Sequence, residues 1–154
     1  MSFESAQNDL QAKGYGDRII VTSQSSATVA LAAQALGIEE GRIAKTLSFM
    51  VGDVPVLILA AGNARVDNHK YKETFHKKAK MMSEEQLAEY VGHQPGGVCP
   101  FGVKDDRVQI YLDESLKAYD EVYPACGSAA SAVRLSIADL ENCSGFCKWI
   151  NVTK

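Results

Sequence analysis

The sequence predicts an α+β fold, a mixed α/β domain in which helices, hairpins and short strands follow one another irregularly. Three observations support this fold class. The chain has 154 residues, a length typical of one domain. Its 46% apolar and 23% charged residues are ordinary for a globular protein. The strand-like runs include an adjacent pair and do not simply alternate with helices, which argues against a doubly wound parallel sheet.

The strands are predicted from β-branched, apolar or alternating runs. They cover residues 18–22, 43–51, 54–61, 107–112, 122–123 and 132–135. Gly52 and Asp53 indicate a hairpin between the second and third strands. Because residues 54–60 are apolar on both faces, the third strand should be central and buried.

The helices are predicted where apolar residues recur at helical spacing behind a capping residue. The first contains Phe3 and Leu10, the second ends at Gly37, and the third spans about 67–77. The expected N-caps after the first helix are Ser25 or Ser26, then Asp67, Ser83 with its capping-box partner Gln86, and Ser136. Residues 96–102 are too rich in glycine and proline for regular structure.

Composition also limits which binding partners and which cellular compartment are expected. No apolar run approaches the roughly 20 residues that span a bilayer, so no membrane partner is expected. The first five residues lack the basic start and apolar core of a secretory signal, so we expect a cytoplasmic protein. The net charge of −3 argues against a general nucleic-acid coat but leaves room for a local basic patch.

The four cysteines are Cys99, Cys126, Cys143 and Cys147. Without a secretory signal, free thiols are expected rather than disulfides. Cys143 and Cys147 are spaced C-x3-C, but no second close pair of Cys or His completes a four-ligand zinc site. Structural thiols are therefore favoured over a metal. The chain has no dinucleotide fingerprint and no P-loop, and no cofactor is expected.

Lys45 is the most informative residue for chemistry. In a strand over residues 43–51, alternation puts it on one face with Ile43, Leu47 and Phe49, so its ammonium projects among large apolar groups. An ammonium withdrawn from water needs a partner, or its pKa falls. Lys45 is thus a candidate for binding an anion or polarising a carbonyl. The alternatives are a strand-edge lysine that reaches back to water and a β-bulge that turns the side chain outward.

The segment Gly96-Gly97-Val98-Cys99-Pro100-Phe101-Gly102 is the second candidate site. Its adjacent glycines allow positive φ and close approach of a ligand to backbone N–H groups, and Pro100 stiffens the turn. Such a loop can form an amide nest for a carbonyl or carboxylate oxygen, or it can be a long connection. Cys99 could act as a nucleophile with His93 as its base, but a structural thiol is favoured.

One basic stretch stands out in this acidic chain. It contains His69, Lys70, Lys72, His76, Lys77, Lys78 and Lys80. On a helix over residues 67–77, Lys70 and Lys77 would lie two turns apart on one face, and Lys78 would extend the patch. The stretch is a candidate for contacting a phosphate backbone, with a solvated helix face as the alternative.

Three segments together resemble the YbaK/ProX family of aminoacyl-tRNA editing domains, which are related to the insertion in bacterial prolyl-tRNA synthetase. Residues 41–47 resemble the strand that carries the family's essential lysine, here Lys45. Residues 96–100 resemble its GxxxP loop. Residues 122–127 and 132–140 resemble its terminal strands and final helix. The segments occur in the family's order and extend over nearly the whole chain.

The resemblance implies a curved mixed sheet flanked by helices, forming one editing domain over residues 1–154. It also implies hydrolysis of the ester that joins an amino acid to the 3′ end of tRNA, with Lys45 as the catalytic residue and no metal. The substrate-binding residues it implies are Gly96, Gly97, Val98, Cys99, Pro100, Gly127 and Ser128. For a tRNA partner, the basic stretch supplies three candidate backbone contacts: Lys70, Lys77 and Lys78.

The chain departs from the family pattern at two places. Cys99 stands where many relatives have serine, and residues 128–131 lack the basic residues or histidine of some subfamilies. Candidate substrates are tRNA for proline carrying cysteine or alanine, with prolyl-tRNA synthetase as a partner, or another activated aminoacyl ester. The alternative from a different class is a non-catalytic binding or regulatory module that keeps the fold.

Overall fold

The computed structural model describes residues 2–154 as a mixed α/β domain. The helices are α1 (Ser2–Ala12), α2 (Val29–Leu36), α3 (Asn68–Phe75), α4 (Glu84–Gln86), which continues as a π-helical turn over Leu87–Val91, and α5 (Ile137–Cys143). The strands are β1 (Ile19–Val21), β2 (Ala44–Val51), β3 (Val54–Ala61), β4 (Gln109–Asp113), β5 (Glu121–Val122), β6 (Ser131–Val133), β7 (Leu135–Ser136) and β8 (Lys148–Ile150).

The largest sheet has the strand order β2-β3-β4-β8. β2 and β3 form the antiparallel hairpin expected around Gly52 and Asp53, whereas β3–β4 and β4–β8 pair in parallel. β3 is internal and buried along nearly its whole length, which confirms the prediction from its apolar run. β8 was not predicted, because a three-residue strand with an exposed Lys148 carries no periodic signal.

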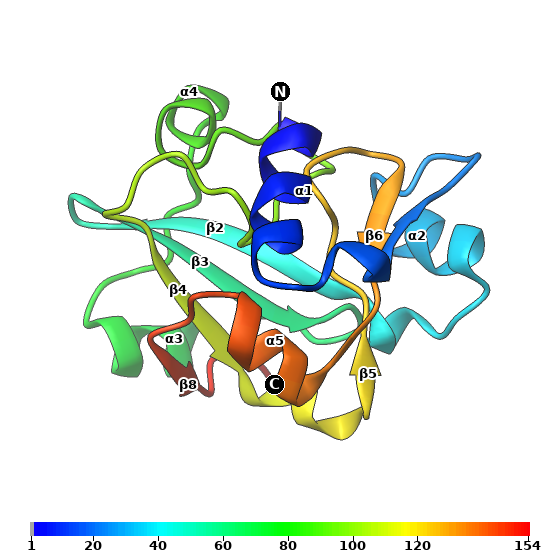
Figure 1. The fold of residues 1–154 in the computed structure, drawn as a ribbon. Helices are drawn as coiled ribbons and strands as arrows, with labels where there is room; N and C mark the ends of the chain where they lie inside the picture. Colours follow the sequence, from blue (N-terminus) through cyan, green and yellow to red (C-terminus); the bar gives the residue numbers. More distant parts are fainter. Residues whose placement is uncertain (1) are drawn as a thin grey trace.

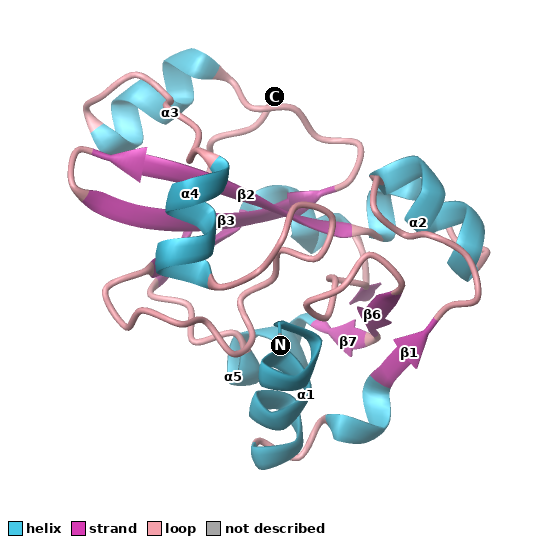
Figure 2. Ribbon diagram, turned by 90° about the horizontal axis from the view of Figure 1, so that it is seen from above, coloured by secondary structure: helices cyan, strands magenta, loops and turns pink. Residues whose placement is uncertain are grey.

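The sheet separates two apolar layers (Figures 1 and 2). α1 and α5 cover one face, where their residues Leu10 and Leu140 join Leu57 of β3 and Leu112 of β4. α3 covers the other face, where Tyr71 packs with three strand residues: Phe49, Ile58 and Tyr111. The side chains of β4 alternate between the layers, since Ile110 and Leu112 enter the first layer and Tyr111 the second.

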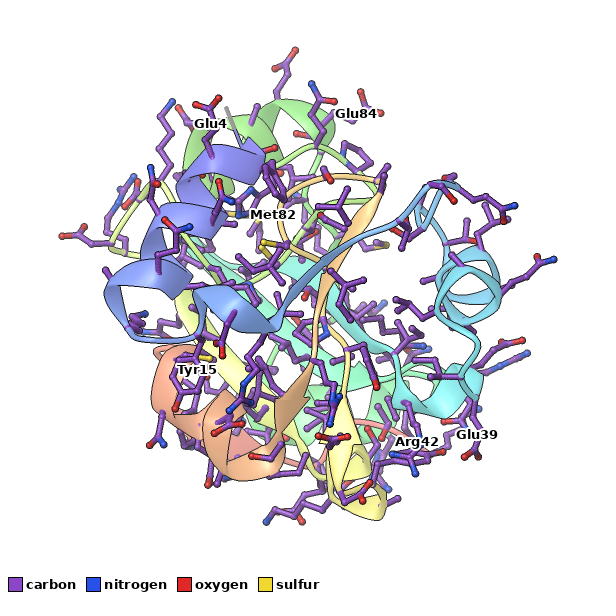
Figure 3. All side chains as sticks on the ribbon, turned by 45° about the vertical axis from the view of Figure 1, so that its right-hand side comes forward. Glu4, Tyr15, Glu39, Arg42, Met82 and Glu84 are labelled. Carbon is purple, nitrogen blue, oxygen red and sulfur yellow. The ribbon has the colours of Figure 1, made fainter. Side chains whose placement is uncertain are left out.

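The chain also forms two small antiparallel sheets, β1–β6 and β5–β7, and Tyr123, the residue after β5, contacts the start of β2. Ala44 donates its N–H to the carbonyl of Tyr123, and Tyr123 donates its own to the carbonyl of Arg42. The Arg42 guanidinium pairs with Glu39 at 3.4 Å and with Asp120 at 2.7 Å (Figure 3). These contacts fix the beginning of the strand that bears Lys45.

The helix caps confirm three predictions and correct two others. Asp67, Ser83 and Ser136 cap their helices, the last two as capping boxes. α2 is capped by Thr28, not by Ser25 or Ser26. Likewise, α3 ends at Phe75 rather than at Lys77, because His76 adopts a left-handed conformation with φ of 61°. Within residues 2–154, no helix is long and apolar enough to cross a membrane.

Candidate functional site

A small pocket of about 140 Å³ lies between the start of β2, the entrance to α2 and the glycine-rich loop. Its lining residues are Ser26, Ala27, Thr28, Val29, Ile43, Ala44, Lys45, Thr46, Gly96, Val98 and Ala125. The fold therefore brings together the strand and the loop that sequence analysis singled out, although some 50 residues separate them. We call this cavity the central pocket.

Lys45 lies half-buried at the border of the central pocket. Its ammonium donates to the carbonyl of Gly62 at 3.4 Å and to the carbonyl of Ala64. Burial, reinforced by the positive charge of Arg65, lowers the pKa of Lys45 below its ordinary value. Because an ammonium has three N–H donors, one remains for a ligand after these two bonds.

The apolar surroundings predicted for Lys45 are present only in part. Leu47 and Phe49 pack into the layer beneath α3, whereas Ile43 packs with residues of α2. The lysine is thus held by two carbonyls at the start of the strand rather than enclosed by one apolar face. Alternation places its neighbours Ala44 and Thr46 on the opposite face, toward the glycine-rich loop.

The N-terminus of α2 forms the second wall of the pocket. Thr28 and Val29 line the cavity, and the Thr28 hydroxyl accepts a hydrogen bond from the Leu31 N–H at 3.1 Å. The first turn of a helix carries unpaired N–H groups and a partial positive charge. With Lys45, it gives the pocket an electropositive lining suited to a carbonyl oxygen or an anion.

The loop over residues 96–100 supplies the third wall through Gly96 and Val98. Gly96 has a φ of 90°, a conformation that favours glycine. The Gly97 N–H is occupied by the carbonyl of Gln94 at 3.0 Å. Within residues 2–154, the N–H groups of Gly96 and Val98 have no protein acceptor. The loop can therefore offer two amides to a ligand in the pocket.

Gly97, Gly127 and Ser128 face another space. They line a hollow of about 490 Å³ beside the N-terminus of α1. The Ser2 hydroxyl donates to the Gly127 carbonyl, and the Ser128 hydroxyl lies 2.7 Å from that of Ser131. The predicted substrate residues are therefore split between two sides of one loop, with Gly96 and Val98 on the side of Lys45.

Cys99 does not fit a nucleophile, because it is fully buried and lies outside the lining of the central pocket. Its sulfur lies 3.4 Å from His93 Nε2, but that nitrogen is 2.8 Å from the Phe101 carbonyl, to which it donates. A protonated Nε2 cannot take the thiol proton. Burial further raises the pKa of the Cys99 thiol and lowers that of His93. Pro100 is buried as well.

The cysteines are all free thiols, three of them buried and Cys147 exposed.

The basic stretch is arranged differently from the prediction. Lys70 turns toward the C-terminal segment and donates to the carbonyl of Thr153 at 2.7 Å. Lys77 and Lys78 are exposed beyond the end of α3, so Lys70 and Lys77 do not share a helix face. Lys78 instead lines a hollow of about 490 Å³ with Asn68, His69, Lys72 and Ala79.

Sequence reasoning missed the contribution of residues 26–29 and of Thr46 to the pocket. For Thr46 a signal existed, since strand alternation beside Lys45 gives it the opposite face. For Ser26 none existed, because the irregular segment before α2 reaches β2 only through the tertiary fold.

Comparison with known proteins shows the family of the chain. The family model for the aminoacyl-tRNA editing domain matches residues 23–143. The uncharacterized protein YwhH of Bacillus subtilis is 49% identical over 131 residues, which are 84% of this chain and 83% of YwhH. The "Putative Cys-tRNA(Pro)/Cys-tRNA(Cys) deacylase EbsC" of Enterococcus faecalis is 34% identical over 107 residues, 68% of this chain and 64% of that protein.

Larger proteins and solved structures extend the likeness. A proline–tRNA ligase of Shouchella clausii is 37% identical over 102 residues, which are 66% of this chain but 17% of the ligase. The crystal structure of "a putative trans-editing enzyme for prolyl tRNA synthetase" superposes with a TM-score of 0.88 at 29% identity, covering 99% of this chain and 97% of the other. The chain thus belongs to the aminoacyl-tRNA editing domain family.

Proposed function

We propose that this chain is an aminoacyl-tRNA deacylase, which releases a wrongly attached amino acid from the 3′ end of tRNA. The observation that carries the proposal is the central pocket. In a member of the editing family, it places Lys45, the amides of Gly96 and Val98 and the first turn of α2 around one small cavity. An activated ester needs mainly positioning and stabilisation of the carbonyl oxygen, and these groups supply both.

In the proposed reaction, the oxygen of a water molecule bonds to the ester carbonyl carbon. The bond from that carbon to the ribose oxygen then breaks, and the ribose oxygen takes up the proton that the water gives up. The ribose 2′-hydroxyl assists by holding the water. The loop amides stabilise the negative charge on the carbonyl oxygen, and the free N–H of Lys45 keeps the substrate in register.

The finer assignment is tRNA for proline carrying cysteine or alanine. Its support is the printed description of EbsC and the match to proline–tRNA ligases, which also motivates prolyl-tRNA synthetase as a partner. Aminoacylated tRNA is present in the cytoplasm, where we place the reaction. A pocket of about 140 Å³ fits this assignment, because it admits only a small side chain.

The tRNA backbone is proposed to follow the basic stretch along α3 and beyond its end. Lys77 and Lys78 remain candidate contacts, whereas Lys70 is engaged by the C-terminal segment. Lys72 takes its place, since it shares a hollow with Lys78. His69 also lines this hollow but lies 2.6 Å from the Glu73 carboxylate, so the two lysines supply the positive charge.

The decisive test is a deacylation assay with a panel of tRNAs, each charged with a correct or an incorrect amino acid. The proposal predicts that the chain hydrolyses at least one mischarged tRNA and spares the correctly charged ones. A chain that binds tRNA but hydrolyses none of the panel, alone or with prolyl-tRNA synthetase, would be a binding module instead.

A further inference from the structure

We infer that Arg65 binds the 5′-phosphate of the terminal tRNA nucleotide, beside the place where Lys45 holds the aminoacyl ester. The inference rests on the proposed deacylase function and adds a second anchor point for its substrate. It concerns the phosphate on one side of the terminal ribose, whereas the central pocket receives the amino acid attached on the other side.

Arg65 differs from the other arginines of the chain because it has no acidic partner. The sequence contains five arginines. Four of them pair with a carboxylate at 2.7 to 3.1 Å: Arg18 with Asp139, Arg42 with Asp120, Arg107 with Asp105 and Arg134 with Glu121. The exposed side chain of Arg65 makes no ion pair and no hydrogen bond within residues 2–154. Its five N–H donors are therefore available to an anion.

The backbone fixes Arg65 next to the ammonium of Lys45. Lys45 Nζ donates to the carbonyl of Ala64, which belongs to the peptide group that joins Ala64 to Arg65. The carbonyl of Arg65 in turn accepts a hydrogen bond from the Lys154 N–H at 3.0 Å, which ties this segment to the end of the chain. The positive charge of Arg65 contributes to the lowered pKa of Lys45, so the two cations lie within electrostatic reach of each other.

Neither of these two cations is neutralised by a carboxylate within ion-pair distance among the described residues 2–154. The nearest acidic residue along the chain is Asp67, which is engaged elsewhere. Its carboxylate caps α3 by accepting hydrogen bonds from the N–H groups of His69 at 3.0 Å and Lys70 at 3.2 Å. Because like charges repel, an anion that contacts Arg65 beside Lys45 would relieve this repulsion.

The chemistry and the position of Arg65 identify the anion. A guanidinium presents its donors in a planar fork that matches two oxygens of a phosphate. Since Lys45 is proposed to hold the ester in register, the terminal ribose lies beside it, and the 5′-phosphate is the anion carried by that ribose. Arg65 also precedes α3, along which the tRNA backbone is proposed to run. A phosphate bound to Arg65 would thus connect the central pocket with the basic stretch.

The test measures the binding of two analogues of the tRNA 3′ end that cannot be hydrolysed as esters. Both are adenosines joined to alanine through a 3′-amide; one carries a 5′-phosphate and the other a 5′-hydroxyl. By calorimetry, the wild-type chain should bind the phosphorylated analogue about tenfold more tightly, the effect expected of charge-assisted hydrogen bonds. In Arg65→Gln, the ratio of the two dissociation constants should approach one, through a loss on the phosphorylated analogue. Arg65→Lys keeps the charge without the fork and should retain part of the ratio.

The matched control is Arg107→Gln, which removes the same charge from an exposed arginine outside the lining of the central pocket. It should leave the ratio unchanged. Because the Arg65 side chain makes no hydrogen bond within residues 2–154, Arg65→Gln should not lower the melting temperature appreciably.

Three results would overturn the inference: equal binding of the two analogues by the wild-type chain, binding of neither, or an unchanged ratio in Arg65→Gln. Inorganic phosphate that displaces the phosphorylated analogue at an equal concentration would also overturn it, because the contact would then serve any small anion. Hydrolysis of a mischarged tRNA in the deacylation panel would show that the proposed function stands whichever of these results is found. Absence of hydrolysis across that panel would overturn the proposed function itself.

Discussion

Gly97 lies directly against the backbone of Gly127. A Cβ atom added to Gly97 would come within 2.6 Å of the Gly127 carbonyl carbon and of the Ser128 nitrogen. Real Cβ atoms do not approach backbone this closely, so one of the two segments would have to move. The glycine-rich loop and the segment before β6 are therefore held in one arrangement by a contact that only glycine permits.

This contact predicts the effect of Gly97→Ala. The displaced loop would carry Gly96 and Val98 away from Lys45, so kcat should fall by about tenfold or more, while stability should fall by roughly 1–3 kcal/mol. Deacylation kinetics and thermal melting would measure the two effects. The control is Gly16→Ala, whose new methyl would meet Cγ of the exposed Gln11 side chain at 2.5 Å and backbone, the Gln11 Cα, only at 3.4 Å. Full activity in Gly97→Ala would show that the loop position is unimportant for catalysis.

The role of Lys45 predicts a loss of activity without unfolding. Lys45→Ala should reduce kcat/KM about 100-fold or more, the effect expected when a group that positions the substrate for reaction is lost. The fold should survive, because removing a half-buried ammonium also removes the cost of its desolvation. Circular dichroism beside the kinetic assay would separate the two effects. Unchanged turnover in a folded variant would contradict the assigned role.

The surroundings of Lys45 also predict its titration. Burial and the charge of Arg65 lower the pKa of Lys45, so Lys45 should lose its proton at a lower pH than a free lysine side chain does. NMR spectroscopy of the lysine side chains would detect this order. Arg65→Gln removes the repelling charge and should move the pKa of Lys45 back upward, leaving only the effect of burial. No upward change would mean that Arg65 does not act on Lys45.

The buried position of Cys99 predicts that its thiol is dispensable. Cys99→Ser should keep most of the deacylase activity, because water is the proposed nucleophile and a serine hydroxyl can reach the Phe101 carbonyl in place of the sulfur. Alkylation of the native protein should modify Cys147 rapidly and leave activity intact, since the other three thiols are buried. A covalent thioester, or complete loss of activity in a normally folded serine variant, would show instead that Cys99 reacts.

The sequence predicted the fold best where a signal was local. The hairpin at residues 52–53, the central β3 and the capping boxes at Ser83 and Ser136 each follow from a few adjacent residues. The cap of α2 could not be predicted from adjacent residues, because Ser25, Ser26 and Thr28 are all suitable capping residues. Only the packing of the folded chain decides among them.

The candidate site was predictable in its parts but not in its assembly. Lys45 and residues 96–100 each carried a chemical signal, yet nothing in the sequence indicated that Gly96 and Gly97 face opposite hollows. The contribution of Ser26 to the pocket could not be recognised before the surrounding backbone was known. Similarly, α3 ends early because His76 adopts a left-handed conformation. Residues other than glycine rarely adopt this conformation, and no sequence pattern predicted it here.

The last prediction concerns how an acidic protein holds tRNA. With a net charge of −3, attraction must come from a local patch, and the hollow lined by Lys72, Lys78 and His69 is the candidate. Neutralising a phosphate releases counterions, so affinity should fall with salt by roughly 0.9 log units per contact on a duplex. Replacing Lys72 and Lys78 together with alanine should weaken tRNA binding and flatten this slope.

The matched control replaces Lys104 and Lys148, two exposed lysines outside the hollow, so that the net charge changes equally. If the tRNA follows the hollow, only the first pair should change the slope, and hydrolysis of a short aminoacyl-adenosine mimic should be nearly unchanged in both variants. Such a mimic occupies only the central pocket and does not reach the hollow. Lys77→Ala, tested separately, would show whether the tRNA-binding patch also includes Lys77. Equal slopes in wild type and in the Lys72 and Lys78 variant would mean that this stretch is a solvated face and that tRNA binds elsewhere.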